Sequence, residues 1–150
     1  MPQSLSQVIL HIVFSTKDRS RYLDDAVRER VHAFLATLCR ARDCGAYRVG
    51  GTNDHVHLIC RLSRTITISK LIEDLKRESS KWIKTLGAEY TAFHWQKGYG
   101  AFSLSRSHLD TAIAYVENQV EHHRTVSFQD EFRELLRRYE VEFDERYVWD

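Results

Sequence analysis

The sequence has no strong excess of charge of either sign and no long hydrophobic run. Lysine and arginine exceed aspartate and glutamate by only one in 150 residues, so net charge does not mark the chain as a nucleic-acid binder. No apolar stretch approaches the roughly 20 residues that a membrane helix needs, and the N-terminus lacks a signal-peptide pattern. We therefore expect a cytoplasmic protein that does not contact a membrane.

Cysteine is also scarce, and its spacing matches no common zinc motif. The three cysteines are odd in number, which favours reduced thiols over a disulfide framework. Cys39 and Cys44 could in principle build a structural zinc site with histidines. Core packing is the preferred interpretation, because Cys39 falls on the apolar stripe of a predicted helix and Cys60 ends a predicted strand.

Internal repeats and low-complexity linkers are absent, so residues 1–150 are expected to form one domain. Charge is unevenly distributed along it: residues 1–84 hold 15 Lys and Arg against 9 Asp and Glu, whereas residues 85–150 hold 7 against 12. A basic first half could contact a polyanion, and the acidic second half could pair with it or with a partner subunit. Two solvated surfaces that merely differ in charge are the simpler alternative.

Hydrophobic periodicity predicts an alternation of strands and helices. The predicted strands are residues 6–16, 46–49, 55–62 and 93–105, the last interrupted by Gly98 and Gly100, and the predicted helices are residues 24–42, 67–86, 107–124 and 127–139. The order β-α-β-β-α-β, followed by helices, predicts an α+β fold: a ferredoxin-like (split β-α-β) antiparallel sheet with two helices on one face. In this topology the first and third strands are central neighbours. The C-terminal helices and an aromatic, acidic tail are additions to it.

His55 and His57 are the first candidate site residues. Side chains alternate between the two faces of a strand, so both imidazoles point the same way. Two imidazoles on one face can share a divalent metal ion and leave its other positions open for substrate. The pair alone is a weak indication, because histidines on a half-buried strand are more often packed or exposed. A third ligand and a reactive group are therefore needed.

A polar stripe on the predicted helix 107–124 supplies both. Tyr115 and Gln119 are four residues apart, so they lie one above the other. A tyrosine hydroxyl, with a reference pKa near ~10, needs help as a nucleophile, which a divalent metal provides at a scissile phosphate. Gln119 could offer that metal a neutral oxygen. An exposed helix tyrosine is the alternative. His122 and His123 could form a second metal or phosphate contact, but adjacent helical residues diverge by ~100°, so both are expected on the surface.

Five basic residues are candidate phosphate contacts. Lys17 and Arg19 lie in a predicted loop after the first strand, and Lys70, Arg77 and Lys81 share the polar face of the predicted helix 67–86. A solvated loop and an ordinary solvated helix face are the alternatives. The remaining single histidines are expected to be structural: His11, His32, His94 and His108.

With these residues in place, the sequence resembles the single-tyrosine HUH transposases of minimal bacterial insertion sequences, a family that includes the REP-associated tyrosine transposases. The matching segments are residues 8–17, His55-Val56-His57 after Asp54, residues 95–103, Tyr115-Val116-Glu117-Asn118-Gln119, residues 122–124 and residues 144–149. The likeness spans essentially the whole chain. The resemblance implies that His55, His57 and Gln119 hold Mg²⁺ or Mn²⁺ and that Tyr115 forms a 5′-phosphotyrosine on single-stranded DNA.

The resemblance also implies partners. It implies a homodimer, in which the tyrosine helix of one subunit could complete the site of the other, and recognition of hairpins near the ends of a mobile element. Two alternatives remain open. A domesticated relative would bind or nick hairpins without moving an element, and a non-catalytic ferredoxin-like module would bind nucleic acid or metal regardless of Tyr115→Phe.

Overall fold

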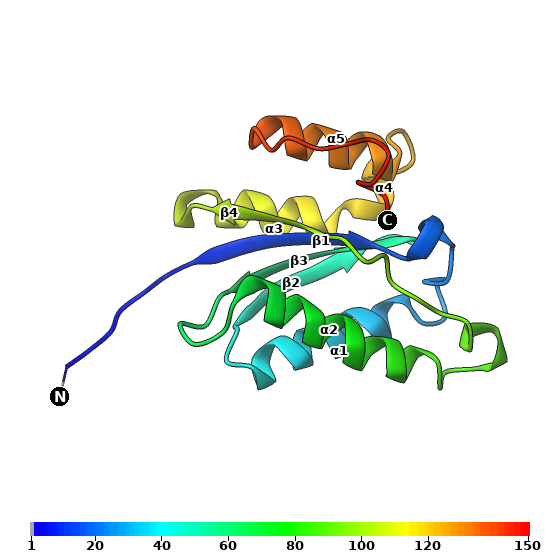
Figure 1. Cartoon of the computed structure of the whole chain (residues 1–150), viewed down its shortest axis with the longest axis horizontal. Helices are drawn as coiled ribbons and strands as arrows, with labels where there is room; N and C mark the ends of the chain where they lie inside the picture. The colour runs from blue at the N-terminus through cyan, green and yellow to red at the C-terminus, as the bar shows by residue number, and fades with distance from the viewer. Residues whose placement is uncertain (1) are drawn as a thin grey trace.

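A computed structural model describes residues 2–150, in which four strands form an antiparallel sheet (Figure 1). The strands are β1 Ile9–Ser15, β2 Ala46–Gly51, β3 His55–Arg61 and β4 Gly100–Leu104. Their order in the sheet is β2-β3-β1-β4, and every pair of neighbours is antiparallel. This arrangement confirms the predicted α+β, ferredoxin-like sheet, with β1 and β3 at its centre.

Two helices, α1 Arg28–Ala41 and α2 Ile68–Ile83, cover one face of the sheet (Figure 1). Alternate residues of the two central strands, among them Phe14 and Leu58, face these helices and are fully buried. The hydroxyl of Thr67 accepts a hydrogen bond from the backbone amide of Lys70 and caps the start of α2. This face forms the larger apolar core, as the helical periodicity predicts.

The other face carries α3 Leu109–Glu117, the single turn α4 Gln119–His122, and α5 Phe128–Arg138 (Figure 1). Three short 3₁₀ turns connect the main elements: η1 Lys17–Arg19, η2 Ala88–Tyr90 and η3 Arg106–His108. The rings of Phe128 and Phe132, both in α5, stack on each other, and Trp149 of the C-terminal tail packs against both. The tail therefore helps to hold α5 over the sheet.

The predicted helix 107–124 is wrong as a continuous element. Asn118 has φ −96° and ψ 19°, which is not helical, so α3 ends before it and α4 starts after it. Asparagine is a poor helix former, because its side chain competes for backbone hydrogen bonds. The break changes the direction in which the residues from Gln119 onward point. The predicted strand 93–105 is also shorter, because β4 begins only at Gly100 and the segment before it forms a single isolated bridge, between Trp95 and Thr16, beyond the end of β1.

Gly50 allows β2 and α3 to approach each other closely. A Cβ atom on Gly50 would lie 2.4 Å from the backbone oxygen of Val116 in α3. At the next position, Gly51 has φ +150°, in a region that side chains rarely adopt, and begins the turn into β3. The double glycine therefore sets both the hairpin before the histidine pair and the position of the tyrosine helix.

The three cysteines are free and buried in the core between the sheet and α1. Cys60 lies on the face of β3 opposite to His55 and His57, since successive side chains of a strand alternate. The hypothetical zinc site built from Cys39, Cys44 and the histidine pair is therefore wrong, and core packing is confirmed. In residues 2–150 no helix has the length and hydrophobicity that crossing a membrane requires.

Candidate metal centre and nucleophile

His55 and His57 are fully buried on the face of β3 that lies under α3, α4 and α5. The Nδ1 of His55 donates to Oδ1 of Asp54 at 2.8 Å, and the Nδ1 of His57 lies 2.7 Å from Nε2 of His11 on the neighbouring strand. A hydrogen bond at one ring nitrogen fixes the orientation of the imidazole and the direction in which its other nitrogen points. Both rings therefore present Nε2 toward a common point.

The structure brings Tyr115 and Gln119 to the same place within one chain. The Oε1 of buried Gln119 lies 3.0 Å from Nε2 of His55. The ring of Tyr115 meets the ring of His57 edge to face, with centroids 5.8 Å apart. The four residues singled out from sequence are therefore neighbours, although their separation along the chain reaches 64 positions.

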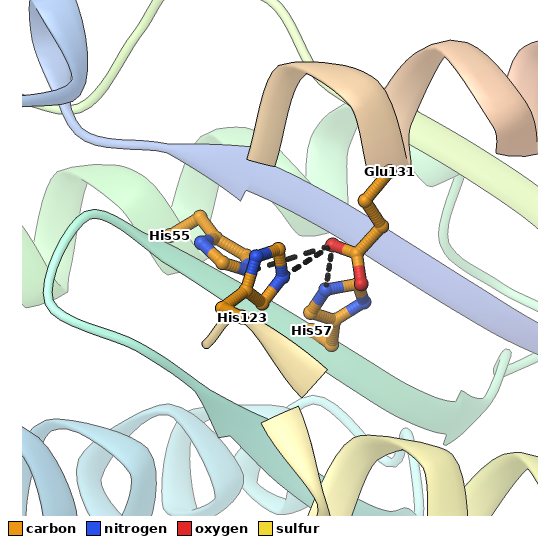
Figure 2. Close-up of side chains that lie close together, drawn as sticks. All are labelled: His55, His57, His123 and Glu131. Atoms are coloured by element: carbon orange, nitrogen blue, oxygen red, sulfur yellow. Dashed lines mark hydrogen bonds and ion pairs between the residues drawn. The ribbon is translucent and has the colours of Figure 1, made fainter. Parts of the chain in front are cut away.

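Glu131 of α5 completes the cluster and was missed by the sequence analysis (Figure 2). It is only 4% exposed, its Oε1 lies 2.9 Å from Nε2 of His57, and the amide of Gln119 donates to its Oε2 at 3.0 Å. The hydroxyl of Tyr115 also donates to Oε2. A signal was present in the sequence, because helical periodicity places this carboxylate on the apolar stripe of Phe128 and Leu135.

His123 corrects the expectation that both adjacent histidines lie on the surface. Its side chain is 9% exposed, and its Nε2 lies 3.1 Å from Oε1 of Glu131 (Figure 2). This contact has ion-pair distance, but the buried nitrogen makes no hydrogen bond in the part of the chain described. The physical reason is that the helix is broken at Asn118 and ends at His122, which turns His123 inward. His122 remains about one-third exposed.

Burial and mutual contact shift the pKa values of the clustered groups. Burial alone would lower the pKa of His55, but Asp54 and Glu131 raise it to about 9. Burial lowers the pKa of His57. Burial opposes ionisation of Glu131, yet the close contacts of its carboxylate with His123, His55 and His57 hold its pKa well below the usual range. Burial together with this carboxylate raises the pKa of Tyr115. At neutral pH the cluster therefore contains a carboxylate, a protonated His55 and a neutral phenol.

The donor set fits a divalent metal ion. One potential ligand atom from each of His55, His57, His123 and Glu131 lies within 4.8 Å of the other three. Imidazole nitrogen and carboxylate oxygen are common ligands of divalent ions in proteins. The buried Nε2 of His123, which lacks a hydrogen-bond partner, is the kind of atom that a bound ion would satisfy.

A cavity of about 770 Å³ between α3, α5 and β4 reaches the tyrosine. Its wall includes His11, His108, Tyr115, Glu131, Arg138 and Tyr139. Arg138 is exposed, and among residues 2–150 no carboxylate lies within ion-pair distance of it. The cavity therefore offers a route to the Tyr115 hydroxyl. Its wall carries exposed Arg138, which the sequence analysis did not select, together with the carboxylates of Asp130, Glu131 and Glu134.

The candidate DNA contacts on α2 do not reach this site. Lys70, Arg77 and Lys81 belong to a helix that covers the opposite face of the sheet (Figure 1). Lys70 and Arg77 pair with Asp74 at 3.2 and 3.0 Å, which offsets much of their charge.

The candidate contacts on η1 lie nearer to the histidines. The amide of Thr16, which precedes η1, donates to the carbonyl oxygen of Asp54 at 2.8 Å. The guanidinium of Arg19 lies 5.8 Å from the ring centroid of Trp149. Of the five basic candidates, only Lys17 and Arg19 therefore belong to the end of the sheet that holds His55.

The fold and the cluster define an α+β protein with a candidate metal centre beside a tyrosine hydroxyl. The chain belongs to the IS200-like transposase family, whose model, described as "Transposase IS200 like", matches residues 4–119. This confirms the family inferred from the sequence motifs. The match ends at Gln119, so His123 and Glu131 lie outside the matched segment. No curated protein matches the chain.

Two solved structures are similar in fold. One is a provisionally identified transposase from Deinococcus radiodurans R1, with 19% identity and a TM-score of 0.62, over 79% of this chain and 98% of that chain. The other is a REP-associated tyrosine transposase bound to a REP hairpin, with 12% identity and a TM-score of 0.61, over 84% of this chain and 74% of that one. At these identities the likeness shows the fold alone.

Proposed function

We propose that the protein is a single-stranded DNA transposase that cuts and rejoins strands through a 5′-phosphotyrosine on Tyr115. The observation that carries the proposal is the convergence of Tyr115, His55, His57 and Gln119 in one site of one chain. Family membership supports the reaction class. Because Tyr115 lies against the histidines of its own chain, we propose that attack occurs within one subunit.

In the proposed reaction, the phenolic oxygen of Tyr115 attacks the scissile phosphorus. The new bond from tyrosine to phosphorus forms as the bond from phosphorus to the 3′ oxygen breaks, and the 3′ oxygen gains a proton while the phenol loses one. The phosphotyrosine retains the energy of the broken bond, so attack by another 3′ hydroxyl rejoins a strand.

His55, His57 and Gln119 would hold Mg²⁺ or Mn²⁺, which when bound polarises the phosphate and stabilises charge on its oxygens. Asp54 and His11 orient the two histidine rings from behind. Glu131 accepts the hydrogen bond of the Tyr115 hydroxyl and so directs that hydroxyl toward the histidines.

The proposed partner is single-stranded DNA with hairpins at the ends of an element, handled in the cytoplasm by a homodimer. Residues 1–150 act as one catalytic domain. The strand reaches Tyr115 through the cavity between α3 and α5, where Arg138 contacts a phosphate. Lys17 and Arg19, which follow the other end of β1, offer a second phosphate contact, whereas the ion-paired row on α2 contributes little.

The test is a denaturing gel of the protein mixed with labelled single strands from the DNA that flanks its gene. A slow band that requires Mg²⁺ or Mn²⁺ and disappears with Tyr115→Phe supports the proposal. Cleavage without such a band contradicts the tyrosine mechanism and favours water as the nucleophile. Binding without cleavage favours the non-catalytic module. A domesticated relative gives the same band and differs only in whether an element moves.

A further inference from the structure

Two buried side chains outside the segment matched by the family model face the histidine pair (Figure 2). Oε1 of Glu131 lies 2.9 Å from Nε2 of His57, 3.1 Å from Nε2 of His123 and 3.5 Å from Nε2 of His55. Three histidine nitrogens therefore surround one carboxylate oxygen. Such a cluster is costly to bury unless its groups are paired or bound to a metal.

We propose that Glu131 and His123 are ligands of the same metal ion as His55 and His57. The result is a site of three histidines and one carboxylate that selects a first-row transition-metal ion over Mg²⁺. This inference rests on the proposed metal-dependent function of the site and extends it to ligands that the resemblance does not include.

The spacing of the four ligand atoms fits a single ion. All four lie within 4.8 Å of one another. Ligands at ~2.0–2.2 Å around a tetrahedral ion are separated by roughly 3.4 Å, and opposite ligands of a six-coordinate ion by roughly 4.3 Å. The ion therefore needs only small movements of side chains that are already in place.

The ring nitrogens are arranged for metal binding. Nδ1 of His123 lies 2.6 Å from the carbonyl oxygen of Val126, which can only accept a hydrogen bond, so Nδ1 carries the proton. Its Nε2 then has a lone pair, is buried, and has no hydrogen-bond partner among residues 2–150. Nδ1 of His55 likewise donates to Asp54, so this ring is already oriented, and a bound ion would take the place of the proton that its Nε2 carries. Histidine ligands of metals typically have such a support at the other ring nitrogen.

The ligand types set the class of metal. Imidazole nitrogens favour zinc, iron, nickel and copper, and carboxylates add manganese to the ions that fit. Mg²⁺ prefers oxygen ligands and keeps several of its waters, which a fully buried His55 and His57 with a 4% exposed Glu131 leave little room for. Three nitrogen ligands and one oxygen ligand therefore disfavour Mg²⁺.

Glu131 also connects the ion to the nucleophile. Ligation through Oε1 leaves Oε2 free to accept from the Tyr115 hydroxyl and the Gln119 amide, as it does in the structure. In this arrangement Gln119, which the proposed function names as a metal ligand, is instead mainly a positioning residue between His55 and Glu131. Its truncation should weaken metal binding less than loss of Glu131 or His123.

The experiment is a titration of the metal-free, full chain with Co²⁺, followed by visible absorption, and with Mg²⁺ by calorimetry. We expect one Co²⁺ per chain, with the intense visible absorption band that is typical of Co²⁺ with a low coordination number. We also expect Co²⁺ to bind at least about 100-fold more tightly than Mg²⁺. Glu131→Gln and His123→Ala should each weaken Co²⁺ binding by at least about 10-fold and shift the band. The surface controls Glu121→Gln and His94→Ala should leave both unchanged.

A measurement on the wild type does not depend on how the variants fold. X-ray absorption of the Zn²⁺-loaded chain counts imidazole ligands, and we expect three. Two imidazoles, or unchanged Co²⁺ binding in folded Glu131→Gln and His123→Ala, would overturn the inference. If His55→Ala still abolishes binding in that case, the histidine pair remains the metal site of the proposed function. If His55→Ala also has no effect, the proposed metal site is wrong as well.

Discussion

The hydroxyl of Tyr115 donates a hydrogen bond to Oε2 of Glu131 and thereby joins α3 to α5 across the face of the sheet. The other oxygen of the same carboxylate faces His57. One glutamate therefore contacts both the proposed nucleophile and a proposed metal ligand. Glu131 keeps its contact with His57 when the Tyr115 hydroxyl is removed, so the chemistry of the tyrosine can be tested separately from the integrity of the site.

Tyr115→Phe should leave the fold intact while removing the covalent product. The substitution deletes one hydrogen bond to a charged group, but Glu131 keeps its contacts to Gln119 and His57. We expect the free energy of unfolding to fall by about 1–3 kcal/mol. Urea denaturation measures this as a lower midpoint with an unchanged slope. A variant that is unfolded in buffer would show that Tyr115 is primarily structural.

His55→Ala should abolish cleavage while leaving the binding of hairpin DNA largely intact. The residue is buried in the site, whereas the basic side chains of Lys17 and Arg138 are exposed. We expect cleavage in Mn²⁺ to fall by at least about 100-fold, with hairpin affinity, measured by gel shift, changed by less than about threefold. His94→Ala is the exposed control. Loss of both activities together with thermal stability would indicate a structural histidine.

The stability of the metal-free protein should be greatest near pH 6.5. His55 has a pKa raised to about 9, so its contribution is complete below pH 6.5 and is lost as the pH rises through 9. Burial lowers the pKa of His11 to about 3, so unfolding is favoured as the pH falls from 6.5. Between pH 6.5 and 8 we expect a loss of roughly 2 kcal/mol, at about 1.4 kcal/mol per pH unit.

Above pH 8 a second group opposes this loss. The ammonium of Lys76 donates to the carbonyl oxygens of Gln96 and Gly98. Burial of this side chain lowers its pKa to about 8. Its contribution to stability therefore rises with pH from about 8. The test is the urea midpoint of unfolding, measured in the presence of a chelator at pH 5, 6.5 and 8. The control is His55→Gln, which should remove the decline in stability between pH 6.5 and 8. Equal wild-type stability at those two values would contradict it.

Gly50→Ala should disrupt the contact between β2 and the tyrosine helix. The added Cβ would lie 2.4 Å from the backbone oxygen of Val116, which cannot move without shifting α3. We expect the free energy of unfolding to fall by about 1–3 kcal/mol. Gly45→Ala is the matched control, because the nearest atom to its Cβ would be the Arg61 side chain at 3.8 Å. Thermal melts of both variants test this prediction, and we expect a lower melting temperature for Gly50→Ala than for Gly45→Ala. Equal melting temperatures would count against close packing at Gly50.

Much of the fold followed from hydrophobic periodicity, because the strands and the longer helices have clean apolar patterns. The histidine pair followed from strand alternation, and its central position from the order of elements. The basic row on α2 shows a limit of the same reasoning. Periodicity tells which face of a helix is polar, but it does not tell which face of the sheet the helix covers.

Two site residues depended on tertiary structure. His123 points inward only because the chain leaves the helical path at Asn118, and a local break of this kind has a weak sequence signal. Glu131 lies 74 residues from His57 along the chain, so its role becomes visible only when α5 is placed over the sheet. A glutamate between Phe128 and Leu135 on an apolar stripe was nevertheless a signal that could have been followed.

Mass spectrometry of the DNA-linked protein tests the central claim most directly. The wild type is incubated with single strands and Mn²⁺, digested with a nuclease and a protease, and its peptides are sequenced. Our account predicts one modified peptide, with the nucleotide mass on the Tyr115 side chain and attached through the 5′ phosphate. A nucleotide on any other residue, or cleaved DNA with no modified peptide, would contradict it.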